Sequence, residues 1–197
     1  MIHKFFLIFF LLTSNFVIAE NEYKILVTTN NIAITLLDLE KEIKIIKILN
    51  KNKLERNLNF KDIALTNLIN ENVKLIEIDK NNIKIDNQQI ENYLNIFLKV
   101  NKFNKSEIDN EILSLIKKKI KIDASWNILI NKLYGWKINI NMNEINNKII
   151  DSKNKMTEKE LESLKQKLLD LEKDKKLKVF DKYHFAKIKR TIFINYY

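Results

Sequence analysis

The sequence predicts a mainly α-helical fold with several helices and one small β-sheet. Three observations support this prediction. Apolar residues recur at spacings of three and four positions through most of the chain, which is the period of an amphipathic helix. Residue pairs typical of helix caps precede several of these stretches. Segments of β-type composition stand at 25–34 and 191–197, so we expect a hairpin near the start and a strand at the end to pair in one sheet.

The first expected element is the hairpin, with strands at 25–28 and 32–34. The pair Asn30-Asn31 between them suits a tight turn, because asparagine tolerates a positive φ where no glycine is present. Thr35 and Asp38 then have the spacing of a capping box, in which each side chain binds the backbone N–H of the other. The sequence therefore predicts that a helix begins directly after the hairpin and runs to a polar connector.

The middle of the chain is expected to be helical. Leu65, Ile69, Val73 and Ile76 form one apolar stripe, and the single glycine, Gly135, stands where a helix would end. The expected helices lie at 60–80, from Asp86 with Gln89 as its capping partner, from 104 to about 133 with a break near Ser114, and from 141 or 143 to 150, with an extended segment at 136–140.

The C-terminal part is expected to contain two helical pieces and the last strand. Thr157 and Glu160 form a capping box, and the seam Leu161–Leu171 has the 3-4-3 spacing that packs on another helix, either in the same chain or in a second copy. The charged run 172–176 is interpreted as solvated and separates a second piece that carries His184.

Composition makes several classes of site improbable. With one glycine, the chain lacks the glycine-rich loops of P-loop and dinucleotide-binding proteins. Without cysteine it has no disulfide, cysteine–zinc site or iron–sulfur cluster. The two histidines are His3 and His184, so catalytic triads and histidine metal sites are poorly provided for. We therefore expect no enzyme activity, no cofactor and no metal.

The formal net charge is +10, and all basic residues except Arg56 and Arg190 are lysines. Nucleic-acid sites usually rely on arginine, so no nucleic-acid partner is expected, while weak contact with a membrane surface stays open. The lysine run 117–121 is interpreted as a solvated helix face, as are the carboxylates near lysines, namely Asp38, Glu42, Glu71 and Glu77.

The start of the chain resembles an export signal. Met1–Lys4 is short and basic, residues 5–12 are apolar, and Ala19 suits a cleavage site, so residues 1–19 are expected to be a signal peptide cleaved after Ala19. The alternative is an uncleaved anchor, although the apolar stretch is shorter than the ~20 residues that span a membrane. In a Gram-negative cell the expected location is the periplasm.

Several segments together resemble the SurA family of periplasmic chaperones. The residues that carry the resemblance are the hairpin end NNIAIT, the helix LLDLEKEIKIIKIL, the later IDASWNILINKLYGWKININMNEI and the C-terminal FDKYHFAKIKRTIFINYY. The resemblance implies an N-terminal domain at 20–150 and a C-terminal helix and strand at 157–197 that fold back on it. In that family one or two parvulin-type prolyl isomerase domains stand between these parts. Here only the linker 151–156 stands there, so isomerase activity is not expected.

The resemblance implies an ATP-independent holdase that binds unfolded outer-membrane proteins and passes them to the assembly machinery. Such a protein needs exposed apolar surface with a solvated rim. The expected client-binding residues are aromatic, and each has burial in the core as its alternative: Tyr93, Phe97, Phe103, Trp126, Tyr134 and Trp136. Two rival interpretations are a non-catalytic scaffold or membrane-surface module that uses the lysine-rich face, and a degenerate prolyl isomerase.

Overall fold

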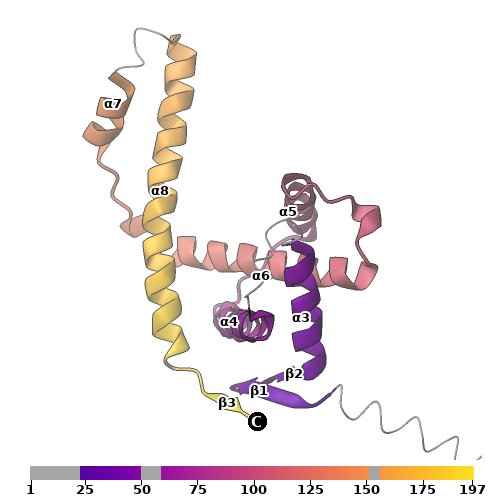
Figure 1. Ribbon diagram of the computed structural model, residues 1–197. Coiled ribbons are helices and arrows are strands. Elements are labelled where there is room, and N and C mark those ends of the chain that lie inside the picture. Colours follow the sequence, from indigo (N-terminus) through magenta and orange to yellow (C-terminus); the bar gives the residue numbers. More distant parts are fainter. Residues whose placement is uncertain (1–22, 50–58, 151–155) are drawn as a thin grey trace, which may run out of the picture.

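The computed structural model describes residues 23–49, 59–150 and 156–197 (Figure 1). The expected signal peptide and all of the expected linker except Met156 lie outside these residues. Within them the chain forms a mainly α-helical fold with one small sheet, as predicted. Its elements are β1 Ile25–Thr29, β2 Ile32–Thr35, α3 Leu36–Leu49, α4 Phe60–Lys80, α5 Asn87–Val100, η1 Lys105–Glu107, α6 Asn110–Tyr134, η2 Gly135–Lys137, α7 Met142–Ile150, α8 Glu158–Lys189 and β3 Ile194–Tyr196.

The sheet is antiparallel, with strand order β2-β1-β3. Val27 lies opposite Tyr196, so the two ends of the described chain meet in one sheet, as predicted. Asn30 at the hairpin turn has a φ of 50° and fixes this meeting point. Its backbone N–H donates to Phe193 O at 2.8 Å, and its Oδ1 accepts from Phe193 N at 3.0 Å. One asparagine therefore closes the hairpin and aligns the last strand.

Local caps set the starts of the helices. Thr35 Oγ1 accepts from Asp38 N at 3.2 Å and Asp38 Oδ2 accepts from Thr35 N at 2.9 Å, which confirms the predicted box before α3. The box of Thr157 and Glu160 before α8 is also confirmed. Asp86, in contrast, makes no side-chain cap at α5, so the predicted pairing with Gln89 is wrong.

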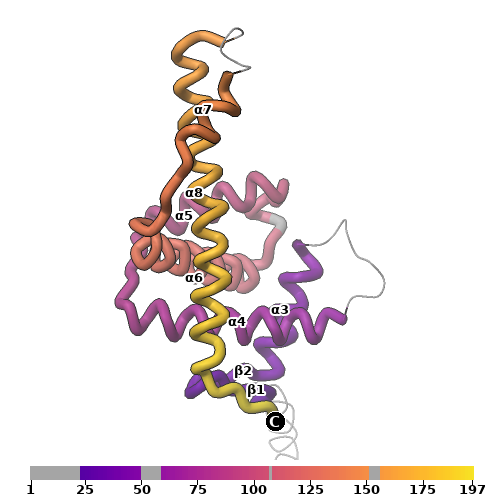
Figure 2. The backbone as a smooth tube through the Cα atoms, turned by 90° about the vertical axis from the view of Figure 1, so that its left-hand side faces the viewer, coloured from indigo at the N-terminus to yellow at the C-terminus, as the bar shows by residue number. Residues whose placement is uncertain are grey.

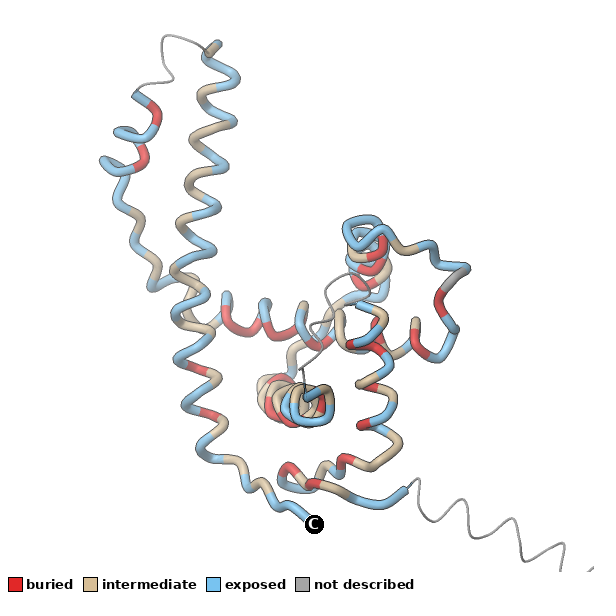
Figure 3. Tube along the Cα trace, in the orientation of Figure 1, coloured by how far each residue is buried: buried red, intermediate tan, exposed pale blue. Residues whose placement is uncertain are grey.

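The body of the molecule consists of α3, α4, α5, α6 and the C-terminal half of α8. In Figure 1, α6 lies across the body, with α4 below it, α5 above it and the sheet at the bottom. Leu129 and Ile188 help to join α6 to α8 in one apolar cluster, and Leu94 and Ile112 join α5 to α6 in another. Buried residues concentrate where these elements meet (Figure 3).

α7 and the N-terminal half of α8 project from this body as an arm (Figure 2). Ile145 and Ile149 of α7 are buried, and Lys148 Nζ lies 3.1 Å from Glu172 Oε1 of α8. The buried residues of α8 are His184 and Ile188, both near its C-terminal end. The arm is therefore a two-helix hairpin with a modest apolar contact, and Leu161, Leu164 and Leu168 of its seam are only half-buried.

Three expected boundaries differ from the structure. α8 is one helix through the charged run 172–176, because lysine and glutamate are good helix formers and nothing in that run breaks a helix. α6 likewise continues through Ser114. Gly135 follows α6 as expected, but its φ is −55°, and it begins the 3₁₀ turn η2 where an extended segment is predicted.

Candidate functional site

A groove with a volume of about 430 Å³ lies on the surface between α5 and α6. Tyr93 forms its α5 side, and Ile120, Ala124 and Ile128 line it from α6. These three positions of α6 are four residues apart, so they lie in one row along the helix. Asp123 and Asn131 add polar groups to the groove. The lining thus combines an apolar row with polar neighbours.

A second hollow, of about 280 Å³, lies on α6 where α8 crosses it. Leu177 and Lys178 line it from α8, and Ile130 lines it from α6. Asn127 lines both hollows, so they adjoin across the surface of α6. We call this continuous surface the α6 groove, and it has α6 as its floor and α5 and α8 as its walls.

The outer face of α5 extends the apolar surface of the α6 groove. Ile96 and Val100 are 57% and 73% exposed, and Tyr93 on the same face is half exposed. At about 100° per residue these three positions fall within roughly 60° of one another. Ile90 and Leu94 point to the other side and are buried. The helix is thus apolar on two faces, and the second of them faces solvent.

The expected client-binding residues divide into three groups. Tyr93 and Trp136 are exposed, and Trp136 is 76% exposed. Phe97 and Phe103 are half-buried and pack against the cluster that contains Leu94 and Ile112. Of the six, Tyr93 alone lines the α6 groove, and Phe97 lies next to it on α5.

Trp126 and Tyr134 belong to the core instead. Trp126 is 2% exposed, and its Nε1 donates to Asp181 Oδ1 at 2.6 Å, which joins α6 to α8. Tyr134 is half-buried and stacks on Phe180 with 4.9 Å between the ring centroids. The expectation that Trp126 contacts a client is therefore corrected, because a client could reach its ring only by disrupting the α6–α8 interface.

His184 of α8 lies between Tyr134 of α6 and Glu77 of α4. Tyr134 Oη lies 2.9 Å from Nδ1 of the histidine, and Nε2 lies 3.5 Å from Glu77 Oε1. Nε2 faces a carboxylate, so we assign the proton of the neutral ring to Nε2 and the hydrogen bond at Nδ1 to donation by Tyr134. Burial lowers the pKa of His184, and the charge of Glu77 opposes this in part. The ring is thus a neutral structural link, in line with the packing role expected for it.

A second polar cluster, which the sequence does not predict, joins α3, α4 and α6. Lys119 of α6 pairs with Glu42 of α3 and Glu71 of α4, and Asn67 donates to Glu42 Oε1 at 3.0 Å. Glu42 is buried at 3% exposure, so the interpretation of Glu42, Glu71 and Lys119 as parts of solvated faces is wrong. Burial raises the pKa of Glu71, and the charge of Lys119 acts against it.

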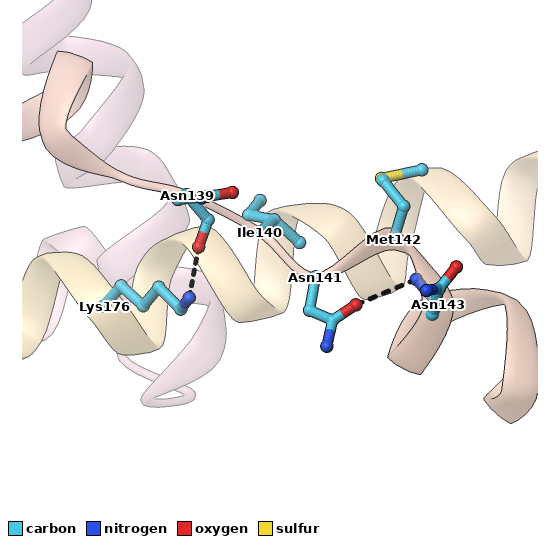
Figure 4. Close-up of a pocket in the computed structure, with 6 residues that line it drawn as sticks. All are labelled: Asn139, Ile140, Asn141, Met142, Asn143 and Lys176. Carbon is cyan, nitrogen blue, oxygen red and sulfur yellow. Dashed lines mark hydrogen bonds between the residues drawn. The ribbon is translucent and has the colours of Figure 1, made fainter.

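A polar recess of about 530 Å³ lies where the connector before α7 passes α8 (Figure 4). Lys176 of α8 donates from Nζ to the backbone oxygen of Asn139, and Asn141 Oδ1 accepts from Asn143 N at 3.0 Å. Met142 adds a half-exposed thioether. These contacts hold the connector against α8.

Within residues 23–49, 59–150 and 156–197, no three histidine or acidic side chains are placed to hold a metal ion together. None of the helices in these ranges combines the length and the apolar character that a membrane crossing requires. Comparison with known proteins adds no relationship, since no family model and no curated protein matches the chain.

Proposed function

We propose that the chain is an ATP-independent holdase chaperone of the periplasm that binds unfolded outer-membrane proteins. The observation that carries this proposal is the α6 groove with its apolar extension on α5. Tyr93, Ile96 and Val100 present a solvent-facing apolar row beside the groove. An unfolded chain offers the matching chemistry, because it exposes apolar side chains along an extended backbone.

Binding at this surface would be driven by burial of apolar side chains on both partners. The polar groups in the groove, such as Asp123 and Asn127, would let the complex stay hydrated at its edge. A shallow surface without deep pockets favours many client sequences over one, and it favours fast release. No covalent step, nucleotide or cofactor is required for such a cycle.

The resemblance to the SurA family supports the same proposal. In that family the last helix and strand return to the N-terminal domain, and here β3 pairs with β1 while α8 packs on α6. Passage of clients to an assembly machinery and location in the periplasm rest on the resemblance and on the expected signal peptide alone. The absence of an isomerase segment from the sequence leaves holding, and not isomerisation, as the expected activity.

The test dilutes a urea-unfolded outer-membrane β-barrel protein into buffer with and without the chain and follows light scattering at low and high salt. Suppressed aggregation at both salt concentrations is the expected result, because apolar burial is not screened by ions. Suppression at low salt only would mean that association is driven by charge, and it would favour the scaffold interpretation over the holdase. No suppression at either concentration would overturn the proposal.

A pair of variants locates the activity. Ile96→Ser with Val100→Ser should weaken suppression severalfold, because both side chains leave the apolar row. Met142→Ser with Ile150→Ser is the matched control, since these exposed apolar side chains lie on α7, away from the groove. All four positions are exposed, so stability should change by less than about 0.5 kcal/mol per site. Equal suppression by both pairs would remove the apolar row of α5 from the proposal.

A further inference from the structure

The outer face of α8 carries a second surface that the holdase proposal does not use. Lys176, Val179, Tyr183, Lys187 and Arg190 follow one another at spacings of three and four positions. At about 100° per residue they fall within roughly 80° of one another, along about 21 Å of helix. Val179 and Tyr183 are 67% and 62% exposed. We call this row the α8 outer face.

Trp136 and Lys137 lie beside this face. Tyr134 stacks on Phe180, and Lys176 donates to the backbone oxygen of Asn139, so the segment between them follows α8 over this turn. Lys137 Nζ lies 5.0 Å from the centre of the Trp136 ring. The segment that carries the exposed indole and the lysine over it therefore runs along the turn of α8 that carries Val179.

The charge of this region is strongly positive. Residues 173–190 contain eight lysines and arginines and two aspartates, which gives a net charge of +6. Glu172, at the upper end of the face, is already paired with Lys148 and Lys175. Within the described part of the chain, Lys187 and Arg190 have no ion pair. These two cations are free to meet anions outside the protein.

We propose that the α8 outer face, together with Trp136 and Lys137, docks on an anionic phospholipid surface. Lipid phosphates would pair with the cations, and the rings of Trp136 and Tyr183 would lie at the level of the headgroups, where aromatic rings with one polar edge are favoured. Val179 would reach the acyl boundary. A nucleic-acid duplex has no apolar layer that would cover Val179, so it fits this combination less well.

The docked orientation leaves the α6 groove free. Asp174 and Lys178 face the groove and lie on the side of α8 roughly opposite to the outer face, by their helical positions. A chain held by its outer face would thus present the groove away from the lipid surface. The two surfaces are independent, and a holdase would keep its client site open while it is held at a membrane.

The experiment uses the full chain and the fluorescence of its two tryptophans. Vesicles of phosphatidylcholine alone are compared with vesicles that contain equal parts of phosphatidylglycerol, each with and without brominated acyl chains. Trp136 is expected to be quenched in the anionic vesicles, while the buried Trp126 serves as an unquenched baseline. Trp136→Phe should abolish the quenching. Residues 5–12 could attach the chain to both kinds of vesicle, so the comparison with phosphatidylcholine alone isolates the contribution of the anionic headgroups.

Matched charge variants decide whether this face makes the contact. Lys137→Gln, Lys187→Gln and Arg190→Gln together should raise the lipid concentration at half-maximal quenching tenfold or more, since each basic residue near an anionic surface adds to binding. The control removes the same charge from exposed sites of α5 and α6, with Lys99→Gln, Lys118→Gln and Lys121→Gln together. It should change the lipid concentration at half-maximal quenching by less than about twofold.

Three outcomes would overturn the proposal. Equal loss in the two triple variants would mean that net charge alone causes the association. Equal quenching in vesicles without phosphatidylglycerol would mean that the association does not depend on anionic headgroups. Trp136 spectral changes with polyglutamate but not with anionic vesicles would assign the face to an acidic protein. None of these results bears on suppression of aggregation, because the α6 groove is unchanged in every variant.

Discussion

Lys119 Nζ on α6 lies 2.6 Å from Glu42 Oε2 on α3, and the same ammonium group pairs with Glu71 on α4. One lysine thus joins three helices of the body. Burial alone would lower the pKa of Lys119, but the two carboxylates raise it above its ordinary value. The ammonium therefore stays charged, and its loss would leave two acidic groups facing each other in a largely dry site.

Lys119→Met is expected to destabilise the protein by about 3 kcal/mol, because it removes the charge that compensates Glu42 and Glu71. Lys118→Met is the matched control, because Lys118 is adjacent in sequence and exposed, and this change should cost less than about 0.5 kcal/mol. Urea unfolding followed by circular dichroism measures both. Similar losses in the two variants would mean that the cluster contributes no more than a surface lysine.

Glu71→Gln is expected to change how stability depends on pH. The folded-state pKa of Glu71 is raised by burial, so the folded state binds more protons than the unfolded state between about pH 4.5 and that pKa. The contribution of Glu71 to stability therefore falls as pH rises through this window. The variant lacks that loss, so its unfolding free energy relative to wild type should rise from pH 4.5 to pH 7. A constant difference would contradict the assignment.

His184→Gln is expected to remove a rise of stability with pH. This effect is opposite in sign to that of Glu71. The folded-state pKa of His184 lies below 6.5 because the ring is buried, so the unfolded state binds more protons between that pKa and about pH 6.5. Wild-type stability should therefore rise with pH in this window and level off above it. Melting temperatures from pH 5 to pH 8 measure the effect, and an equal slope in the variant would assign it to other groups.

Asn30 allows two contributions to the sheet to be separated. Asn30→Gly keeps the positive φ and loses the bond from Phe193 N to Oδ1, so it should cost about 1 kcal/mol. Asn30→Ala loses the same bond and adds the strain of a side chain in a left-handed backbone, for a total of about 2 kcal/mol. Asn31→Ala is the control at the adjacent turn position. Equal costs for the first two variants would show that the backbone is not strained there.

The parts of the fold that depend on neighbouring residues were predictable from the sequence. The capping boxes of Thr35 and Thr157 are local, because both partners are three residues apart and need no other part of the chain. The hairpin turn at Asn30 is local in the same sense. The pairing of β3 with β1 was predictable for a different reason, since strands are predicted near both ends of a mainly helical chain.

The parts that depend on distant neighbours were not predictable. The lysine run 117–121 gives no sign that Lys119 points to the carboxylates of two other helices while Lys118 faces solvent. Periodicity identifies Trp126 as part of an apolar face, but burial of that face is decided by α8, which begins more than thirty residues later. The continuity of α8 through a charged run was missed because a charged helix and a charged loop have similar compositions.

The candidate groove shows the same limit. Tyr93 was identified as an aromatic residue at a helical spacing, whereas Ile96 and Val100 were not singled out. Which face of α5 stays open depends on where α6 passes it, and the sequence of α5 alone contains two apolar faces. Exposure of an apolar row is a property of the assembled helices, and only the structure can assign it.

The position of β1 between β2 and β3 bears on the timing of folding. The first strand forms early in synthesis and can pair with β2 at once, but its other edge stays open until Ile194–Tyr196 has left the ribosome. The sheet is therefore completed after all of the described helices have been made, by a contact of very high sequence separation. An incomplete sheet edge keeps the nascent chain less stable until β3 is in place.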